Sequence, residues 1–227
     1  MMQKRLGADR LDLGPNMIPF PFFGRSLVLA SSSPRRRYLL NLVRIRHRVV
    51  RPKVNERDHA HEDPVRHVLR LASLKAHSVL PEVKRGTILG ADTIVVHRRD
   101  ILGKPRNAAE ARRMLARLSG RWHTVFTGLS ILDAETGIEA TGVERSMVKI
   151  RKMTPAEIDT YVATGEPMDK AGSYGIQGYG AGIVEGIRGC YFNVVGLPVV
   201  RLVRLVRELE TALKKRGRTD GRRELRV

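Results

Sequence analysis

The sequence predicts an α/β fold in which helices flank a mixed, partly antiparallel sheet. Short apolar runs alternate along the chain with segments of helical periodicity. The central apolar runs are joined by short turns, as in an antiparallel meander, whereas the first run leads into a helix. With 227 residues, 42% of them apolar, the chain can also bury one sizeable core. A simple doubly wound sheet is therefore not expected.

The first strand and helix carry an unusual charge pattern. Residues 26–30 are apolar enough for a buried strand, and Ser33 and Pro34 suit the N-cap and first position of a helix. Three arginines, at 35–37, then fall in the first turn. Cations are unfavourable at this positive end of the helix dipole. The pattern is locally frustrated unless an anion joins it.

The next segment predicts a strand around residues 49–50, a polar loop through Glu56 and a second helix. Asp63 and Pro64 start that helix in the same way as Ser33 and Pro34 start the first. Lys75 falls on its apolar face. A lysine so placed either extends its ammonium to the surface or reaches a cleft where it would meet anions.

A β-hairpin is predicted where two apolar runs flank the polar residues 98–100. If the pairing centres near Arg99, Lys104 lies opposite Ile94, on the same sheet face as Asp92. Asp92 interrupts a core strand, and a buried carboxylate is costly without a partner, a metal or a proton. An ion pair made only for structure is the alternative to a functional acid.

The rest of the chain continues the alternation. Asn107 with Glu110 resembles a capping box, and Gly120 ends that helix. A glycine-rich segment precedes the last, amphipathic helix, which starts near Pro198. The other predicted elements are strands at 124–132 and 137–150 and a helix from Thr154 to Gly165.

Charge and cysteine content limit the functional classes. The net charge of +19 suits nucleic acid, an anionic membrane or a phosphorylated small molecule. Residues 35–53 carry eight basic and no acidic residues, but no aromatic side chains alternate with the basic runs as in a stacking surface, so nucleic acid is not expected. No apolar run reaches membrane-spanning length, and Cys190 is the one cysteine, so we expect a cytoplasmic protein.

The chain divides into three parts. Residues 1–25 lack periodicity and read as an N-terminal extension, 26–211 form the domain, and 212–227 read as a basic tail. Phosphate-loop, dinucleotide and CxxC motifs are missing, and the serines at 31–33 lack the GxSxG setting of a serine hydrolase. The histidines of "HAH" at 59–61 could bind metal, although such loops are more often simply exposed.

Four blocks together resemble a known family. They are "SSSPRRRYLL", "GADTIVV", "GKPRNAAEARRMLARLSGRWHTVFTG" and "DKAGSYGIQGYGAGIVEGIRGCYFNVVGLPV". From about Leu27 to Leu209 their order and spacing resemble the Maf family of nucleotide pyrophosphatases, the septum-formation inhibitor homologues. The resemblance implies an inosine-triphosphatase-like fold of two lobes around a cleft, often a homodimer. It also implies hydrolysis of a nucleoside triphosphate to the monophosphate and pyrophosphate with Mg²⁺ or Mn²⁺.

The resemblance also implies roles for particular residues. Glu56 and Asp92 would hold the divalent cation, and Asp92 could instead orient or deprotonate the attacking water. Asn55 departs from the aspartate usual in relatives. The remaining implied roles are phosphate binding by Ser31, Arg35 and Arg36, charge neutralisation by Lys75 and Lys104, and base contact by Gln177.

These roles would relieve the frustrated first turn. A triphosphate at the helix start would meet the positive dipole end and the guanidinium groups of Arg35 and Arg36, with Arg37 at the rim. We therefore expect Arg35→Ala and Arg36→Ala each to lower kcat/KM while leaving thermal stability unchanged or higher.

Two blocks within the resemblance bear on the substrate. "DKAG" at 169–172 and "GIQG" at 175–178 look like the branch acting on dTTP, UTP and modified pyrimidine nucleotides. The 7-methyl-GTP branch has a cysteine in place of the DK pair and a glutamate in place of Gln177. The rival from another class is a basic nucleic-acid-binding regulator, which would not need Asp92 and Glu56 beside its cations. Metal dependence discriminates between the two.

Overall fold

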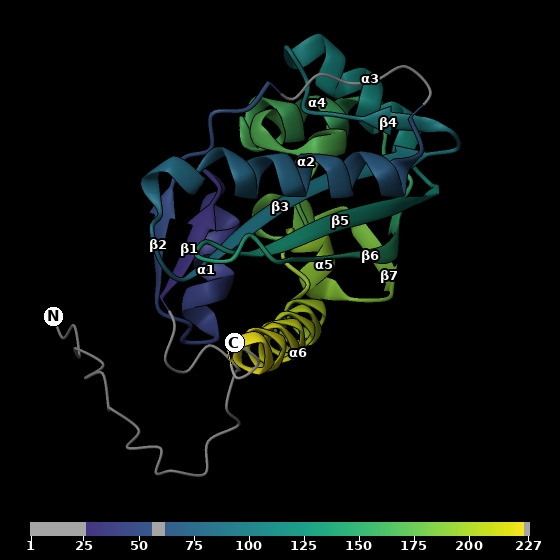
Figure 1. The fold of residues 1–227 in the computed structure, drawn as a ribbon. Helices are drawn as coiled ribbons and strands as arrows, with labels where there is room; N and C mark the ends of the chain where they lie inside the picture. Colours follow the sequence, from purple (N-terminus) through teal and green to yellow (C-terminus); the bar gives the residue numbers. More distant parts are fainter. Residues whose placement is uncertain (1–25, 56–61, 225–227) are drawn as a thin grey trace, which may run out of the picture.

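The computed structural model describes residues 26–55 and 62–224 of the chain, and within them seven strands form one mixed sheet. The strand order is β2-β1-β3-β5-β6-β7, with β4 paired to β3 (Figure 1). The strands are β1 Leu27–Ala30, β2 His47–Val50, β3 Thr87–His97, β4 Asp100–Leu102, β5 Trp122–Asp133, β6 Glu139–Ile150 and β7 Val184–Arg188.

Parallel and antiparallel pairing meet at β3. The pairs β1–β2 and β1–β3 are parallel, and one helix connects β1 to β2 while a second connects β2 to β3. All other pairs are antiparallel, including the long β5–β6 hairpin. The predicted mixed sheet is thereby confirmed.

The helices are α1 Pro34–Leu42, α2 Pro64–Ser78, α3 Ala108–Leu118, α4 Pro155–Ala163, α5 Tyr191–Val195 and α6 Val199–Glu224, with 3₁₀ turns η1 Leu80–Glu82, η2 Glu166–Asp169, η3 Ala171–Ser173 and η4 Gly178–Gly182.

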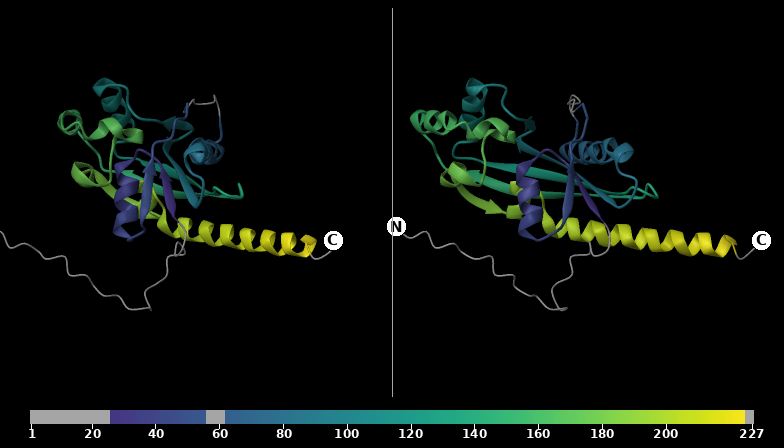
Figure 2. Two further views of the ribbon diagram at one scale, coloured as in Figure 1. Left: turned by 60° about the vertical axis from the view of Figure 1, so that its left-hand side comes forward. Right: turned by 90° about the vertical axis from the view of Figure 1, so that its left-hand side faces the viewer.

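Helices cover both faces of the sheet. Alternate residues of β1 point to opposite faces, so Leu27 and Leu29 join a core with α1 and α6, while Val28 and Ala30 join another with the end of α2. Figure 2 shows α2 and α6 on opposite sides of the strands. Burial of these alternating apolar side chains is the main force that holds the three layers together.

A second lobe packs against the other end of the long strands. Its core joins α3 and α4 to β5, β6 and the segment around Tyr174. In Figure 1 this lobe lies at the far end of the sheet from α1 and α6. The cleft described below opens between the two lobes, as the family resemblance implied.

The predicted helix starts are confirmed. Ser33, Asp63, Asn107 and Thr154 are the N-caps of α1, α2, α3 and α4, and each side chain accepts a backbone N–H of the first turn. Only part of the capping box at α3 forms, because the Glu110 carboxylate accepts the amide N–H of Arg106 instead of that of Asn107. The cap residues thus fix where α1 and α2 begin, and both helices border the cleft.

Two predictions about element geometry were wrong. His97 pairs with Asp100 around a two-residue turn, in which Arg98 adopts a positive φ of 60°, so the pairing does not centre on Arg99. Lys104 therefore does not lie opposite Ile94, and β4 ends before it.

The last helix also differs from expectation. α6 continues without a break past residue 211, and Leu213 packs against the core, so the proposed boundary falls inside a helix. The predicted extension 1–25 lies outside the described residues. None of the described helices is both long and apolar enough to cross a membrane.

Candidate active site

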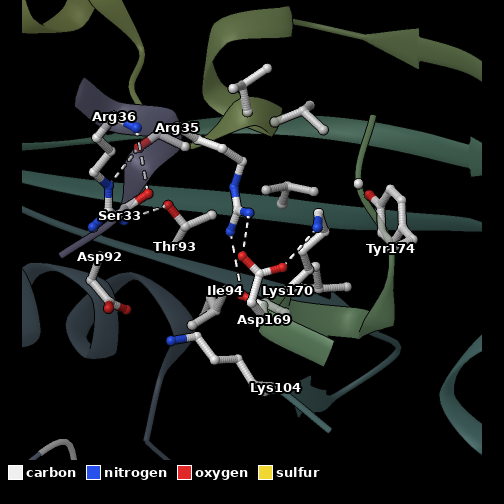
Figure 3. Close-up of a pocket in the computed structure, with 18 of the residues that line it drawn as sticks. Ser33, Arg35, Arg36, Asp92, Thr93, Ile94, Lys104, Asp169, Lys170 and Tyr174 are labelled. Atoms are coloured by element: carbon white, nitrogen blue, oxygen red, sulfur yellow. Dashed lines mark hydrogen bonds and ion pairs between the residues drawn. The ribbon is translucent and has the colours of Figure 1, made fainter. Parts of the chain in front are cut away.

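A cleft of about 780 Å³ lies between the two lobes. The first wall consists of the end of β1, the first turn of α1, Lys75 of α2 and the middle of β3. The second wall is the segment 169–177, with 194–196 at the end of α5 completing the lining. Figure 3 shows charged side chains from both walls pointing into this space.

Arg36 lies at the base of the cleft and is 8% exposed. Its Nε donates to Gly196 O at 2.9 Å, and its Nη1 donates to Ala91 O at 2.9 Å and to Ser31 Oγ at 3.1 Å. Its Nη2 donates to Thr93 Oγ1 at 3.0 Å. Arg36 therefore fastens α1 to β1, β3 and the end of α5. Its replacement by alanine should destabilise the fold, which corrects the expectation of unchanged stability.

Arg35 extends in a different direction from its neighbour. Its Nη1 donates to Asp169 Oδ2 at 2.8 Å, and its Nη2 to the main-chain oxygen of Asp169 at 3.3 Å (Figure 3). The Nε–H has no acceptor among the described residues and is available to an anion. Asp169 thus orients the guanidinium across the cleft from α1 to η2.

Asp169 is a site residue to which the sequence reasoning gave no role. Lys170 Nζ donates to its second carboxylate oxygen at 2.7 Å. Burial would raise the pKa of Asp169, but the hydrogen bonds from Lys170 and Arg35 outweigh it and lower the pKa. The sequence signal was the DK pair itself, which was noted as a branch motif without a physical role.

Lys75 and Asp92 form a buried ion pair beside the first wall. Lys75 Nζ donates to Asp92 Oδ1 at 2.7 Å, and the two side chains are 8% and 9% exposed. The ammonium group of Lys75 therefore reaches the cleft, as one of the two alternatives predicted, and does not extend to the surface. The other Asp92 oxygen makes no hydrogen bond to a described residue, and the carboxylate borders the cleft. It can accept a proton or a cation there.

Lys104 and Gln177 also line the cleft. Lys104 points into the same space as Asp92 (Figure 3), so the error in hairpin register did not remove it from the site. Gln177 immediately precedes η4. The Glu166 carboxylate holds that turn by accepting the amide N–H groups of Tyr179 at 2.8 Å and Gly180 at 2.9 Å.

The described part of the site carries no complete metal centre. Glu56 and the histidines at 59 and 61 lie outside the described residues, and Asn55 before them is exposed. Within the described ranges no three histidine, cysteine or acidic residues gather as ligands. Asp92 is therefore the one predicted ligand whose position is known, and its free oxygen suits a cation that also binds water and phosphate.

A polar network below the cleft was also missed. Thr93 accepts from Arg36 and lies 2.9 Å, Oγ1 to Oγ1, from Thr127, which donates to Asn193 O at 3.1 Å. A threonine directly after Asp92 in an apolar strand is the only signal that could have indicated it. The network fixes the floor of the cleft under the arginine side chain.

Comparison with known proteins identifies the family of the chain. The Maf-like protein family matches residues 26–209. A dTTP/UTP pyrophosphatase of Moorella thermoacetica is 49% identical over 180 residues, which is 79% of this chain and 93% of that protein. A dTTP/UTP pyrophosphatase of Dictyoglomus thermophilum is 45% identical over 83% of this chain and 98% of its own length.

A further relative and one solved structure complete the comparison. The dTTP/UTP pyrophosphatase of Bacillus cytotoxicus is 46% identical over 82% of this chain and 97% of its own length. The Ham1 protein of Staphylococcus aureus superposes with a TM-score of 0.41 and 13% identity, over 70% of this chain and 80% of that one, and carries no argument at that level. The family match covers both walls of the cleft, and the chain belongs to the Maf-like protein family.

Proposed function

We propose that this protein hydrolyses dTTP and UTP to the nucleoside monophosphate and pyrophosphate. The observation that carries the proposal is the position of Asp92, a buried carboxylate beside Lys75 in a cleft whose walls also carry Arg35 and Lys104. Lysine and arginine side chains bind the phosphates of a nucleotide. A carboxylate repels phosphate, so its presence among these cations favours a catalytic role over a role in binding. The substrate assignment rests on relatives that share 45 to 49% of their residues with this chain.

The triphosphate would bind where α1 begins. The first-turn amides and the helix dipole attract anions there, and Arg35 adds the donors that Asp169 leaves free. Lys104 points into the same part of the cleft as Asp92 (Figure 3) and would add a further cation. This arrangement would relieve the charge conflict at Arg35, which gains two anionic partners, Asp169 from the protein and phosphate from the substrate. Arg36 is stabilised instead by buried carbonyl and hydroxyl oxygens.

Asp92 would act on the attacking water. Lys75 occupies one of its oxygens, so the other is the one that can accept the water proton. As the water oxygen bonds to phosphorus, the phosphoanhydride bond breaks and pyrophosphate leaves with the electron pair. Lys104 and Arg35 would then stabilise the negative charge that develops on the leaving oxygens. The same oxygen of Asp92 could instead bind a cation, and both roles require an ionised carboxylate.

A divalent cation, Mg²⁺ or Mn²⁺, is part of the proposal. Asp92 and Glu56 would hold it, because hard cations of this kind prefer carboxylate and phosphate oxygens. When bound, it would neutralise phosphate charge and orient the triphosphate. We place the reaction in the cytoplasm, where nucleoside triphosphates and a reduced Cys190 are expected, and we expect a homodimer as the family resemblance implies.

Base selection is assigned to Gln177. Its amide both donates and accepts, as the edge of uracil or thymine requires, whereas a glutamate there would favour a cationic 7-methylguanine. Gln177 lies in the second wall, in the segment that precedes η4. We therefore expect pyrimidine nucleotides to be preferred, with 7-methyl-GTP as the alternative substrate.

A screen of nucleoside triphosphates with pyrophosphate detection tests the proposal. Pyrophosphate should be released from dTTP and UTP with Mg²⁺ or Mn²⁺ present, and excess EDTA should stop it. Unchanged turnover in EDTA would contradict the cation requirement. A larger kcat/KM for 7-methyl-GTP than for dTTP and UTP would transfer the assignment to the alternative substrate.

A further inference from the structure

Lys170 belongs to the second wall of the cleft and bonds to the residues at the two ends of η2. Its side chain is 14% exposed. Its Nζ donates to Asp169 Oδ1 at 2.7 Å and to the main-chain oxygen of Glu166 at 2.6 Å. Asp169 in turn holds Arg35 through its other carboxylate oxygen. One ammonium group thus connects the residue that orients Arg35 to the start of η2.

The same side chain supports the loop that carries Gln177. A methyl group added to Gly175 would lie only 2.7 Å from Lys170 Cε, so the lysine stem packs directly under this glycine. On the other side of Gln177, Glu166 accepts the backbone N–H groups at the start of η4. Lys170 and Glu166 therefore hold the chain on both sides of Gln177. They are also connected to each other, because Lys170 Nζ donates to the main-chain oxygen of Glu166.

We propose that Lys170 is a positioning residue that couples base selection at Gln177 to triphosphate binding at Arg35. The inference rests on the proposed function. Through Asp169 the lysine fixes the direction of the guanidinium fork, and through Glu166 and Gly175 it fixes the loop that presents the amide. When a base forms hydrogen bonds with Gln177, it stabilises the second wall, and Asp169 of that wall orients Arg35. Lys170 itself contacts neither base nor phosphate in this scheme.

A purely structural role of Lys170 predicts different experimental results. A lysine that only fastened η2 to its neighbours would change the melting temperature when removed, but not the preference between nucleotides. Coupling predicts that affinity for phosphate and discrimination between bases decline together. The two roles are therefore separated by comparing KM, kcat and the ratio of kcat/KM values for two nucleotides.

Lys170→Met is the decisive variant, because methionine keeps much of the stem and removes the ammonium. We expect KM for dTTP to rise about tenfold, the effect of one charge-assisted hydrogen bond, with kcat changed less than about threefold. The preference for dTTP over dATP should fall by about fivefold to tenfold in the same variant. Lys149→Met is the matched control, since Lys149 forms an exposed ion pair with Glu185 on β7 and should leave all these values unchanged.

Inorganic tripolyphosphate tests the Arg35 end without turnover. The variant should need about tenfold more tripolyphosphate than wild type for an equal rise in melting temperature. Equal responses would overturn the inference, as would an unchanged dTTP/dATP ratio in an active variant.

If wild type hydrolyses no triphosphate, the proposed function fails, while the tripolyphosphate comparison still shows whether Lys170 supports anion binding at Arg35. If Lys170→Met does not fold, Asp169→Asn, which weakens the same link, should show the same paired losses, and its failure to do so overturns the inference.

Discussion

The two walls of the cleft position their charged groups by different means. The first wall carries them on regular elements. Arg36 lies in the first turn of α1, Lys75 in the last turn of α2 and Asp92 in the middle of β3, and all three are buried. The second wall and the turn η2 that leads into it have no long helix or strand, and Glu166, Asp169 and Lys170 are held there by hydrogen bonds to one another and to nearby backbone. The first wall is thus fixed by the fold, and the second by its own polar contacts.

Neighbouring arginines show what this difference means. Arg36 bonds to groups of the first wall and to the end of α5, and it is buried as part of the fold. Arg35 is more exposed, with 28% of its side chain accessible, and bonds to the second wall. Two adjacent residues of the same type therefore have different consequences when replaced, one for stability and the other for binding.

The largest effect on activity is expected at Asp92. Asp92→Asn should lower kcat by about 10³-fold, because an amide can neither take a proton from water nor balance a cation. The variant should still fold, with a lower melting temperature, since the buried ion pair between Lys75 and Asp92 is lost. Pyrophosphate release and a thermal melt measure the two effects. Asp159→Asn, an exposed partner of Arg112, is the control, and full activity in Asp92→Asn would refute the assignment.

Arg36→Ala should have the largest effect on stability. Loss of its buried hydrogen bonds to Gly196, Ala91 and Thr93 should cost about 3 kcal/mol of unfolding free energy, or about 10 °C in melting temperature. Denaturant or thermal unfolding measures it. A melting temperature equal to that of wild type would mean that the fold does not depend on these bonds.

Arg35→Ala should spare stability and damage binding. One or two charge-assisted contacts to phosphate are lost, so kcat/KM should fall roughly 10- to 150-fold. The melting temperature should change by less than about 2 °C, as for other partly exposed ion pairs. Arg37→Ala, at an exposed position of the same turn, is the control and should stay close to wild type. Equal losses of kcat/KM at Arg35 and Arg37 would show that only net charge matters.

Gln177→Glu should alter selectivity more than rate. We expect kcat/KM for dTTP and UTP to fall about tenfold, because a carboxylate cannot donate a hydrogen bond to the base. The relative rate with 7-methyl-GTP should rise. Gln177→Ala separates charge from loss of contact, since it should weaken pyrimidines without favouring the methylated purine. An unchanged nucleotide ranking in both variants would remove Gln177 from base recognition.

The smallest effect concerns the attachment of the second wall to the sheet. His123 Nε2 and the Tyr174 hydroxyl are hydrogen-bonded at 2.6 Å, and burial lowers the pKa of His123 from 6.5 to about 4. Because the folded pKa lies below the unfolded one, this group stabilises the fold fully above pH 6.5. That contribution is lost as the pH falls toward 4, and about 1 kcal/mol should be lost by pH 5.5.

Thermal melts between pH 7.5 and 5 check this prediction. Wild type should lose stability more steeply on acidification than His123→Gln, which has no imidazole to protonate. The comparison between the two proteins cancels the titration of groups that both retain. Parallel pH profiles would show that His123 does not link protonation to folding.

Much of the first wall was predictable from local patterns. N-cap residues followed by proline located α1 and α2, and a polar residue within an apolar strand or stripe indicated Asp92 and Lys75. The direction of Lys75 could not be decided by periodicity, because it depends on Asp92, a contact between distant parts of the chain.

The second wall was far less predictable. Its glycine-rich 3₁₀ turns have no repeating hydrophobic pattern, and its contacts join residues far apart in sequence, such as Arg35 and Asp169. The different directions of Arg35 and Arg36 also could not be derived from a run of identical residues. The hairpin register was missed by one residue because Arg98 adopts a left-handed conformation that a bulky residue rarely takes.

The most direct test of the account is the identity of the products. Phosphorus NMR of dTTP incubated with the wild-type protein and Mg²⁺ resolves the monophosphate, the diphosphate, orthophosphate and pyrophosphate. The proposed chemistry predicts equal amounts of the monophosphate and pyrophosphate, with neither formed by Asp92→Asn on the same time scale. Formation of the diphosphate and orthophosphate, or equal turnover by Asp92→Asn, would contradict it.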